Sequence, residues 1–153
     1  MPSRSRTLRF LVAVDFSPES KLAYEVARDL AFRTGASMTL AHVRPYSDVG
    51  AAVAEDRGDL VKKKTQALAA GLRTHYAERF CSIARGTGKV RHLLLRGKPS
   101  LELRREARKG YDLLVIGSRG RGRVASALLG STVRELLASC PIPVVVASRG
   151  IRR

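Results

Sequence analysis

Residues 113–133 read LLVIGSRGRGRVASALLGSTV, and this stretch decides the fold. Its apolar start, Leu113–Ile116, predicts a buried strand, and a helical pattern begins at Val133. Glycines between a strand and a helix let the backbone approach an anion closely, and the helix N-terminus offers free N–H groups. Ser131 and Thr132 add hydroxyls that are expected to cap the helix or to bind a phosphate oxygen. The stretch indicates a phosphate-binding loop, with two plain glycine turns as the alternative.

The glycine spacing differs from that of two common phosphate-binding motifs. Gly117 and Gly120 are followed, after nine further residues, by Gly130. The P-loop motif needs a Lys after its last glycine, and Ser131 stands there instead. The gap between Gly120 and Gly130 is too long for the dinucleotide-binding motif G-x-G-x-x-G. The loop therefore predicts phosphate binding without matching either motif.

Length and composition predict one domain over residues 1–153. The chain has 153 residues, of which 44% are hydrophobic, as is normal for a globular protein. No apolar run approaches the roughly 20 residues that span a bilayer, and the run at 10–14 is too short for a signal peptide. We therefore expect a cytoplasmic protein without membrane contact. Cys81 and Cys140 are expected to be structural thiols, and the three scattered histidines have no metal-ligand spacing.

The net charge of +16 is unusual and attracts polyanions. This charge has three possible explanations: binding to nucleotides, binding to nucleic acid, or a basic surface that only contacts solvent. Basic tails at 1–6 and 149–153 contribute to it, and Arg119, Arg121 and Arg123 alternate with glycines in the loop. Guanidinium groups there would add charge-assisted hydrogen bonds to phosphate. Aromatic residues make up only 5% of the chain, which disfavours stacking on single-stranded nucleic acid.

Hydrophobic periodicity predicts alternating strands and helices along the whole chain. We expect strands at 8–14, 37–43, 90–95, 111–116 and 144–146, with a loop over 46–59. Helices are expected at 18–34, 60–83, 101–109 and 133–138, with Ser17 and Ser100 as caps of the first and third. This alternation predicts an α/β fold, a doubly wound five-stranded parallel sheet of Rossmann-like type with helices on both faces.

In such a sheet, ligands bind beyond the carboxyl ends of the strands, where the strand order reverses. Residues 15–17, 42–44 and 117 onward follow the first, second and fourth predicted strands and should converge there. His42 is expected to pack beside its strand, because the sequence offers it no partner acid. The fold rule and the glycine loop therefore predict the same binding site.

Five segments in order resemble the universal stress protein family, in its ATP-binding subgroup. They are Val14–Ser17, Leu40–Val43, Arg96–Pro99, Asp112–Gly120 with the glycine pair, and Pro141–Val146. Only the glycine segment is specific by itself, but the five at these separations are specific together. The resemblance covers nearly the whole chain and implies an adenine nucleotide alpha hydrolase-like fold.

The resemblance also implies the residues that hold ATP, or another adenine nucleotide, with Mg²⁺ carried by its phosphates. Asp15 matches an acid near the ribose and is also a candidate Mg²⁺ contact; its alternative role is to cap the following helix. The implied site residues are Asp15, Ser17, Val43, Ile116, Gly117, Arg119, Gly120, Gly130, Ser131, Thr132 and Val133.

The predicted function is a nucleotide-dependent stress-response switch with at most slow ATPase activity, because the sequence shows no general base for hydrolysis. The alternative is a basic nucleic-acid-associated stress protein whose glycine loop is structural. Val144, Val145 and Val146 form an apolar last strand. An exposed edge of this kind is satisfied by pairing with a second copy, so we expect a homodimer.

Overall fold

A computed structural model describes residues 6–46, 90–120 and 129–149 of the chain. Its strands are β1 (Arg9–Ala13), β2 (Ser37–Arg44), β3 (Val90–Arg96), β4 (Leu113–Gly117) and β5 (Val144–Ala147). Its helices are α1 (Pro18–Thr34), α4 (Pro99–Ala107) and α5 (Ser131–Ser139). The predicted helix at 60–83 and most of the predicted loop at 46–59 lie outside the described residues, as do most of the basic tails.

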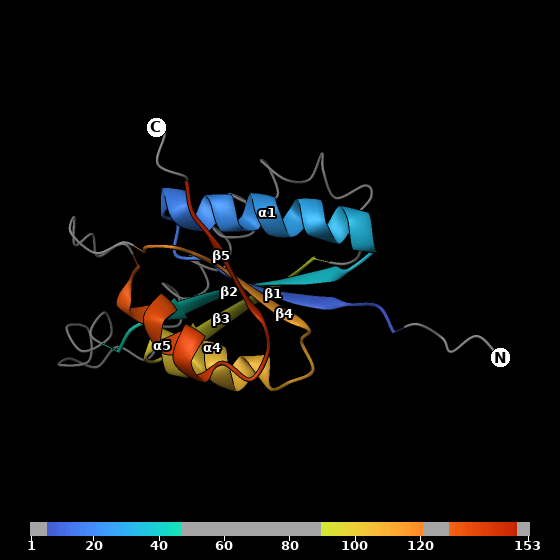
Figure 1. Cartoon of the computed structure of the whole chain (residues 1–153). Coiled ribbons are helices and arrows are strands. Elements are labelled where there is room, and N and C mark those ends of the chain that lie inside the picture. Colours follow the sequence, from blue (N-terminus) through green and yellow to red (C-terminus); the bar gives the residue numbers. More distant parts are fainter. Residues whose placement is uncertain (1–5, 47–89, 121–128, 150–153) are drawn as a thin grey trace, which may run out of the picture.

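The five strands form one parallel sheet in the order β3-β2-β1-β4-β5. Helix α1 covers one face of this sheet, and α4 and α5 lie together on the other (Figure 1). The strand order reverses at β1, because β2 follows on one side of it and β4 is added on the other. The predicted α/β fold with helices on both faces is confirmed, and its switch point lies between β1 and β4.

Alternate residues of the central strands build two separate cores. Phe10 and Val12 of β1 pack with the α1 side, together with Ala23 and Ala27 of that helix. Leu11 and Ala13 face the opposite way, into the core beneath α4 and α5. Because side chains along a strand alternate between its faces, one continuous apolar strand supplies both cores.

The first helix has the ends that its sequence predicts. Ser17 is the N-cap, and its hydroxyl accepts a hydrogen bond from the Ser20 N–H at 3.1 Å. Pro18 occupies the first turn, where its missing N–H costs nothing. Gly35 ends the helix with φ at 68°, a left-handed conformation that glycine adopts without strain. Ser17 and Gly35 therefore set the two ends of α1.

The other two described helices start differently from the sequence prediction. Helix α4 begins at Pro99 with Lys98 as N-cap and without a side-chain cap, so the prediction that Ser100 caps it is wrong. Ser100 lies inside the first turn and is buried. Gly130 is the N-cap of α5, so Ser131 and Thr132 begin the helix rather than cap it. Proline and glycine set these starts through backbone geometry, which leaves the hydroxyls for other contacts.

Candidate functional site

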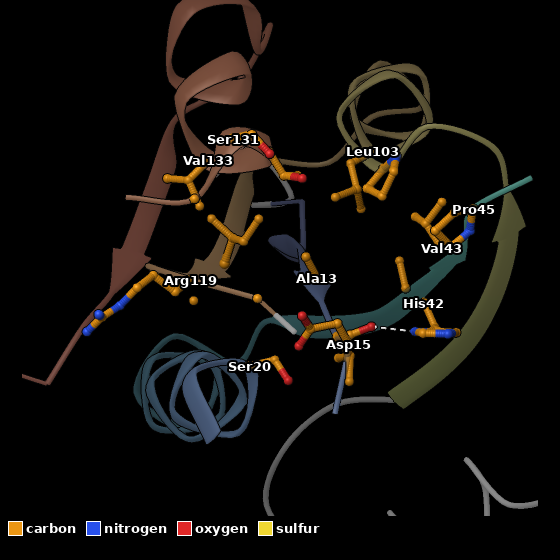
Figure 2. A pocket seen from close by; sticks show the side chains of 18 residues that line it. Ala13, Asp15, Ser20, His42, Val43, Pro45, Leu103, Arg119, Ser131 and Val133 are labelled. Atoms are coloured by element: carbon orange, nitrogen blue, oxygen red, sulfur yellow. Dashed lines mark hydrogen bonds between the residues drawn. The ribbon is translucent and has the colours of Figure 1, made fainter. Parts of the chain in front are cut away.

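A pocket of about 510 Å³ lies beyond the carboxyl ends of β1, β2 and β4 (Figure 2). This volume falls within the range of small-molecule sites in proteins. The pocket is lined by Ala13, Val14, Asp15, Ser20, Ala41, His42, Val43, Pro45, Pro99, Leu103, Ile116, Gly117, Arg119, Gly120, Gly130, Ser131, Thr132 and Val133.

All of the site residues predicted from the sequence line this pocket except Ser17. Ser17 is buried beneath the start of α1, where its hydroxyl caps the helix. Asp15 and Ser131 approach the pocket from opposite sides, and Leu103, Val43 and Pro45 lie together along another side (Figure 2). The parallel sheet therefore brings together segments from both halves of the chain, as the switch-point rule predicts.

A tight turn after β1 holds Asp15 in the pocket. One carboxylate oxygen of Asp15, Oδ1, accepts a hydrogen bond from the Ser17 N–H at 3.0 Å. Phe16 between them has φ at 66°, a left-handed conformation that is uncommon for a residue with a side chain. Asp15 therefore holds the turn before α1 and lines the pocket as well, while Ser17, not Asp15, is the N-cap of that helix.

His42 is fixed from two directions at the end of β2. Its Nδ1 donates a hydrogen bond to the Val14 carbonyl oxygen at 2.7 Å, since a carbonyl can only accept. The centre of its ring lies 5.0 Å from that of Phe16, with the two rings tilted by 54°. His42 packs beside its strand, as expected, and joins β2 to the turn that holds Asp15.

The three loop glycines meet different surroundings. A Cβ at Gly117 would lie 2.6 Å from the backbone of Glu19 in α1, so this glycine lets β4 and α1 approach closely. A Cβ at Gly120 would lie 2.6 Å from the Asp15 Oδ2. At Gly130 the nearest atom of the described residues would be the Arg119 Cα at 3.7 Å, an ordinary contact. The protein itself therefore requires a glycine at 117 but leaves space at 130.

The start of α5 presents polar groups to the pocket. The Gly130 N–H donates to the Ser118 carbonyl at 2.9 Å, which ties the start of the helix to the loop after β4. Ser131, Thr132 and Val133 follow as the first helical residues, and all three line the pocket. First-turn N–H groups have no partner within a helix, and they lie at its positive end. This wall can therefore bind an anion.

Another wall of the pocket is apolar, and most of its residues were not predicted from the sequence. Pro45 and Pro99 lie beyond the ends of β2 and β3, and Leu103 lies one turn into α4. The switch-point rule applied to β3 would have found Pro99. No local signal marks Leu103, or Ser20 and Ala41, because a helix or strand pattern does not tell which residues border a pocket.

The arginines of the loop are placed only in part. Arg119 lines the pocket, but its side chain is exposed and runs away from the other labelled residues (Figure 2). Arg121 and Arg123 lie outside the described residues. The predicted cluster of three guanidinium groups at the pocket therefore stays a prediction.

The described part of the chain offers neither a cluster of metal ligands nor a membrane-spanning helix. Within residues 6–46, 90–120 and 129–149, no group of three or more His, Cys, Asp or Glu side chains is placed to hold a metal ion. In the same ranges no helix is long and apolar enough to cross a bilayer. Asp15 is the sole carboxylate among the described residues that line the pocket.

The sequence model of the universal stress protein family matches residues 7–148. The chain belongs to this family. A universal stress protein of Mycobacterium tuberculosis is 31% identical over 140 residues, which covers 90% of this chain and 44% of that protein. The chain thus spans about half the length of the first curated relatives that it matches.

Solved structures of family members share the fold. The universal stress protein UspA from Lactobacillus plantarum is 23% identical, with a TM-score of 0.72 over 94% of this chain and 99% of that one. Two other matched proteins were solved with nucleotides. One is a universal stress protein in complex with cAMP, 20% identical with a TM-score of 0.62 over 94% of this chain and 98% of that one. The other, from Archaeoglobus fulgidus, is in complex with dAMP, 15% identical with a TM-score of 0.59 over the same shares of the two chains.

Proposed function

We propose that this universal stress protein binds an adenine nucleotide, ATP above all, in the pocket at the switch point. The observation that carries the proposal is the pocket itself, which joins an anion-binding wall at the start of α5 to an apolar wall from β2 and α4. A nucleotide has the matching pair of parts, a phosphate chain and a flat, largely apolar base. The cAMP and dAMP complexes of two related proteins support this choice of ligand.

The two walls suggest which residues would hold which part of the ligand. The N–H groups and hydroxyls of Ser131 and Thr132 would bind phosphate oxygens, and the open space at Gly130 would let the phosphates approach the backbone. Val43 and Leu103 would flank the base. Asp15, between the walls, would meet the ribose hydroxyls or Mg²⁺ bound to the phosphates.

A regulatory role fits this pocket better than rapid catalysis. Phosphoryl transfer to water needs a group that orients the water and charge that stabilises the transferred phosphoryl. Asp15, the acid that the described residues supply, is already engaged in its turn through the Ser17 N–H. We therefore propose a cytoplasmic stress-response switch with at most slow ATPase activity, in which bound nucleotide favours one conformation or interface over another.

Gly130→Ala tests the proposal. The backbone at Gly130 has φ at −67° and ψ at 158°, which alanine adopts freely, and among the described residues the new Cβ would meet no atom closer than 3.7 Å. The added methyl group would occupy space needed by a phosphate, so we expect the ATP·Mg²⁺ affinity to fall at least about tenfold, or about 1.4 kcal/mol. Isothermal titration calorimetry of both proteins with ATP, ADP, AMP and cAMP measures this.

Two outcomes would contradict the proposal. If the wild-type protein binds none of the four nucleotides at millimolar concentration, the glycine loop is structural, and the basic surface becomes the feature to explain. If Gly130→Ala binds ATP as well as the wild type does, the phosphates lie elsewhere. If the wild type hydrolyses ATP at an ordinary enzymatic rate and Gly130→Ala does not, the protein is an ATPase and the proposed regulatory switch is wrong.

We also propose that β5 pairs with its copy in a homodimer. Strand β5 is an edge of the sheet. The Pro143 and Ala147 carbonyls accept hydrogen bonds from Leu114 and Ser118, so the backbone groups of residues 143, 145 and 147 face β4. The backbone N–H and C=O groups of successive residues point to opposite sides of a strand. Those of Val144 and Val146 therefore face away from β4, where a second strand can pair with them.

The outward N–H of Val146 gives a direct test of this dimer. Val146→Pro removes that N–H without removing a hydrogen bond to β4, and proline is tolerated on an edge strand. We expect the variant to elute as a monomer in size-exclusion chromatography with light scattering. Val146→Ala, which keeps the N–H, is the matched control and should stay dimeric. Dimeric Val146→Pro would place the interface elsewhere.

A further inference from the structure

The helices that carry the two walls of the pocket are joined by a polar contact outside it. The Glu135 Oε2 on α5 accepts a hydrogen bond from the Ser100 Oγ on α4 at 2.6 Å. The same oxygen lies 2.7 Å from the Lys98 Nζ at the N-cap of α4. None of these three residues lines the pocket. The contact therefore joins two elements that a ligand would touch without itself touching the ligand.

Both ends of this contact lie close to pocket residues. Glu135 follows Ser131 by one helical turn, and residues four apart lie on the same side of a helix. Ser100 lies between Pro99 and Leu103, which line the apolar wall. The carboxylate of Glu135 therefore links the phosphate side of the pocket to its apolar side, and each end of the contact lies about one turn of helix or less from a pocket residue.

The α4 end of the contact is itself held in place. Ser100 is 4% exposed, so its hydroxyl is fixed within the packed first turn of α4. The Gly97 N–H donates to the Arg44 carbonyl at 2.9 Å, which fastens the turn before α4 to the end of β2. Gly97 has φ at 140°, and a Cβ there would lie 2.9 Å from the Glu102 Cγ, so this turn favours glycine.

The charges favour the contact at neutral pH. The hydrogen bonds from Lys98 and Ser100 lower the pKa of Glu135 below its ordinary value, so the carboxylate stays ionised. Helices α4 and α5 also pack against each other, and Leu103 of α4 and Val133 of α5 belong to the same hydrophobic core. An exposed ion pair contributes little to stability as a rule, so the interest of this contact lies in the two helices that it joins.

We propose that Glu135 is a positioning residue that sets the separation of the two pocket walls. It thereby favours ligands that contact both walls over ligands that contact one. This proposal rests on the proposed function and names its selectivity: adenosine carrying a phosphate chain is favoured over adenosine alone. Adenosine needs only the apolar wall, whereas ATP must also meet the start of α5 at the correct distance.

Glu135→Gln tests this with a ratio of affinities. Glutamine keeps an oxygen that can accept from Ser100 but loses the charge that holds Lys98. We expect the ATP affinity to fall about threefold to tenfold, with the adenosine affinity unchanged within about twofold. Both are measured by displacement of a fluorescent ATP analogue. Glu25→Gln is the matched control, because it removes an exposed Lys21–Glu25 pair on α1, away from the pocket walls.

The outcomes separate this proposal from the one on which it rests. If ATP and adenosine weaken together, or neither changes, Glu135 does not set the separation of the walls and only the positioning role fails. If the wild-type protein binds no nucleotide, the proposed function fails and the positioning role fails with it. Urea unfolding shows whether Glu135→Gln remains folded. The double variant Lys98→Glu/Glu135→Lys exchanges the two charges and should restore the wild-type ratio of ATP affinity to adenosine affinity.

Discussion

Gly117 and Gly130 belong to one sequence motif but stand in different parts of the molecule. Gly117 ends β4 beneath the first turn of α1, where a Cβ would lie 2.6 Å from the Glu19 carbonyl oxygen. Gly130 caps α5 at the edge of the pocket, where a Cβ would meet no atom of the described residues closer than 3.7 Å. The fold explains the first glycine and leaves the second unexplained. A glycine in a binding motif is therefore evidence of a ligand only where the protein itself has room for a side chain.

The largest expected effect separates these two positions by stability. Gly117→Ala forces the backbone of α1 away from β4, because the clash is with main-chain atoms and no rotamer relieves it. We expect a loss of about 2–3 kcal/mol in the free energy of unfolding. Gly130→Ala should stay within about 1 kcal/mol of the wild type. Urea unfolding of the wild type and the two variants without nucleotide measures both values. Equal losses of stability in the two variants would contradict the difference between the two glycines.

A smaller effect is expected at Ser17, the predicted site residue that lies outside the pocket. Ser17→Ala removes the acceptor for the Ser20 N–H, and loss of an N-cap typically costs about 1 kcal/mol. Because Ser17 does not line the pocket, the ATP affinity should not change. Thermal unfolding and calorimetry on the same preparation test both parts. If Ser17→Ala binds ATP more weakly but is as stable as the wild type, Ser17 belongs to the binding site, as the sequence alone predicted.

The smallest effect is a pH dependence at Glu135, on the same helix as Gly130. Its pKa is lowered in the folded protein, first by the Lys98 hydrogen bond and then by that of Ser100. The stabilisation is therefore present above the unfolded pKa, near 4.5, and is lost as the pH falls through the lowered folded value. Wild type and Glu135→Gln should differ in stability at pH 7, and the difference should disappear as the pH falls through the lowered pKa of Glu135. A difference in stability that does not shrink on acidification would contradict the ionic contact.

Arg119 shows the limit of reading a site from its motif. The sequence places this residue between two phosphate-loop glycines, which indicates a phosphate contact. In the structure it borders the pocket, but its side chain extends outward into solvent (Figure 2). The direction of a long side chain depends on neighbours from other segments, and these are not encoded in the loop itself.

Among the described residues, the sequence by itself determined the order of strands and helices, the ends of α1 at Ser17 and Gly35, and the segments that meet at the switch point. These depend on hydrophobic period, caps and turns, which act over a few residues. Only the tertiary structure decided that Gly117 is needed for packing, that Leu103 borders the pocket and that Glu135 joins α4 to α5. Such contacts pair residues far apart in the chain, and the crossing of helices over the sheet brings them together.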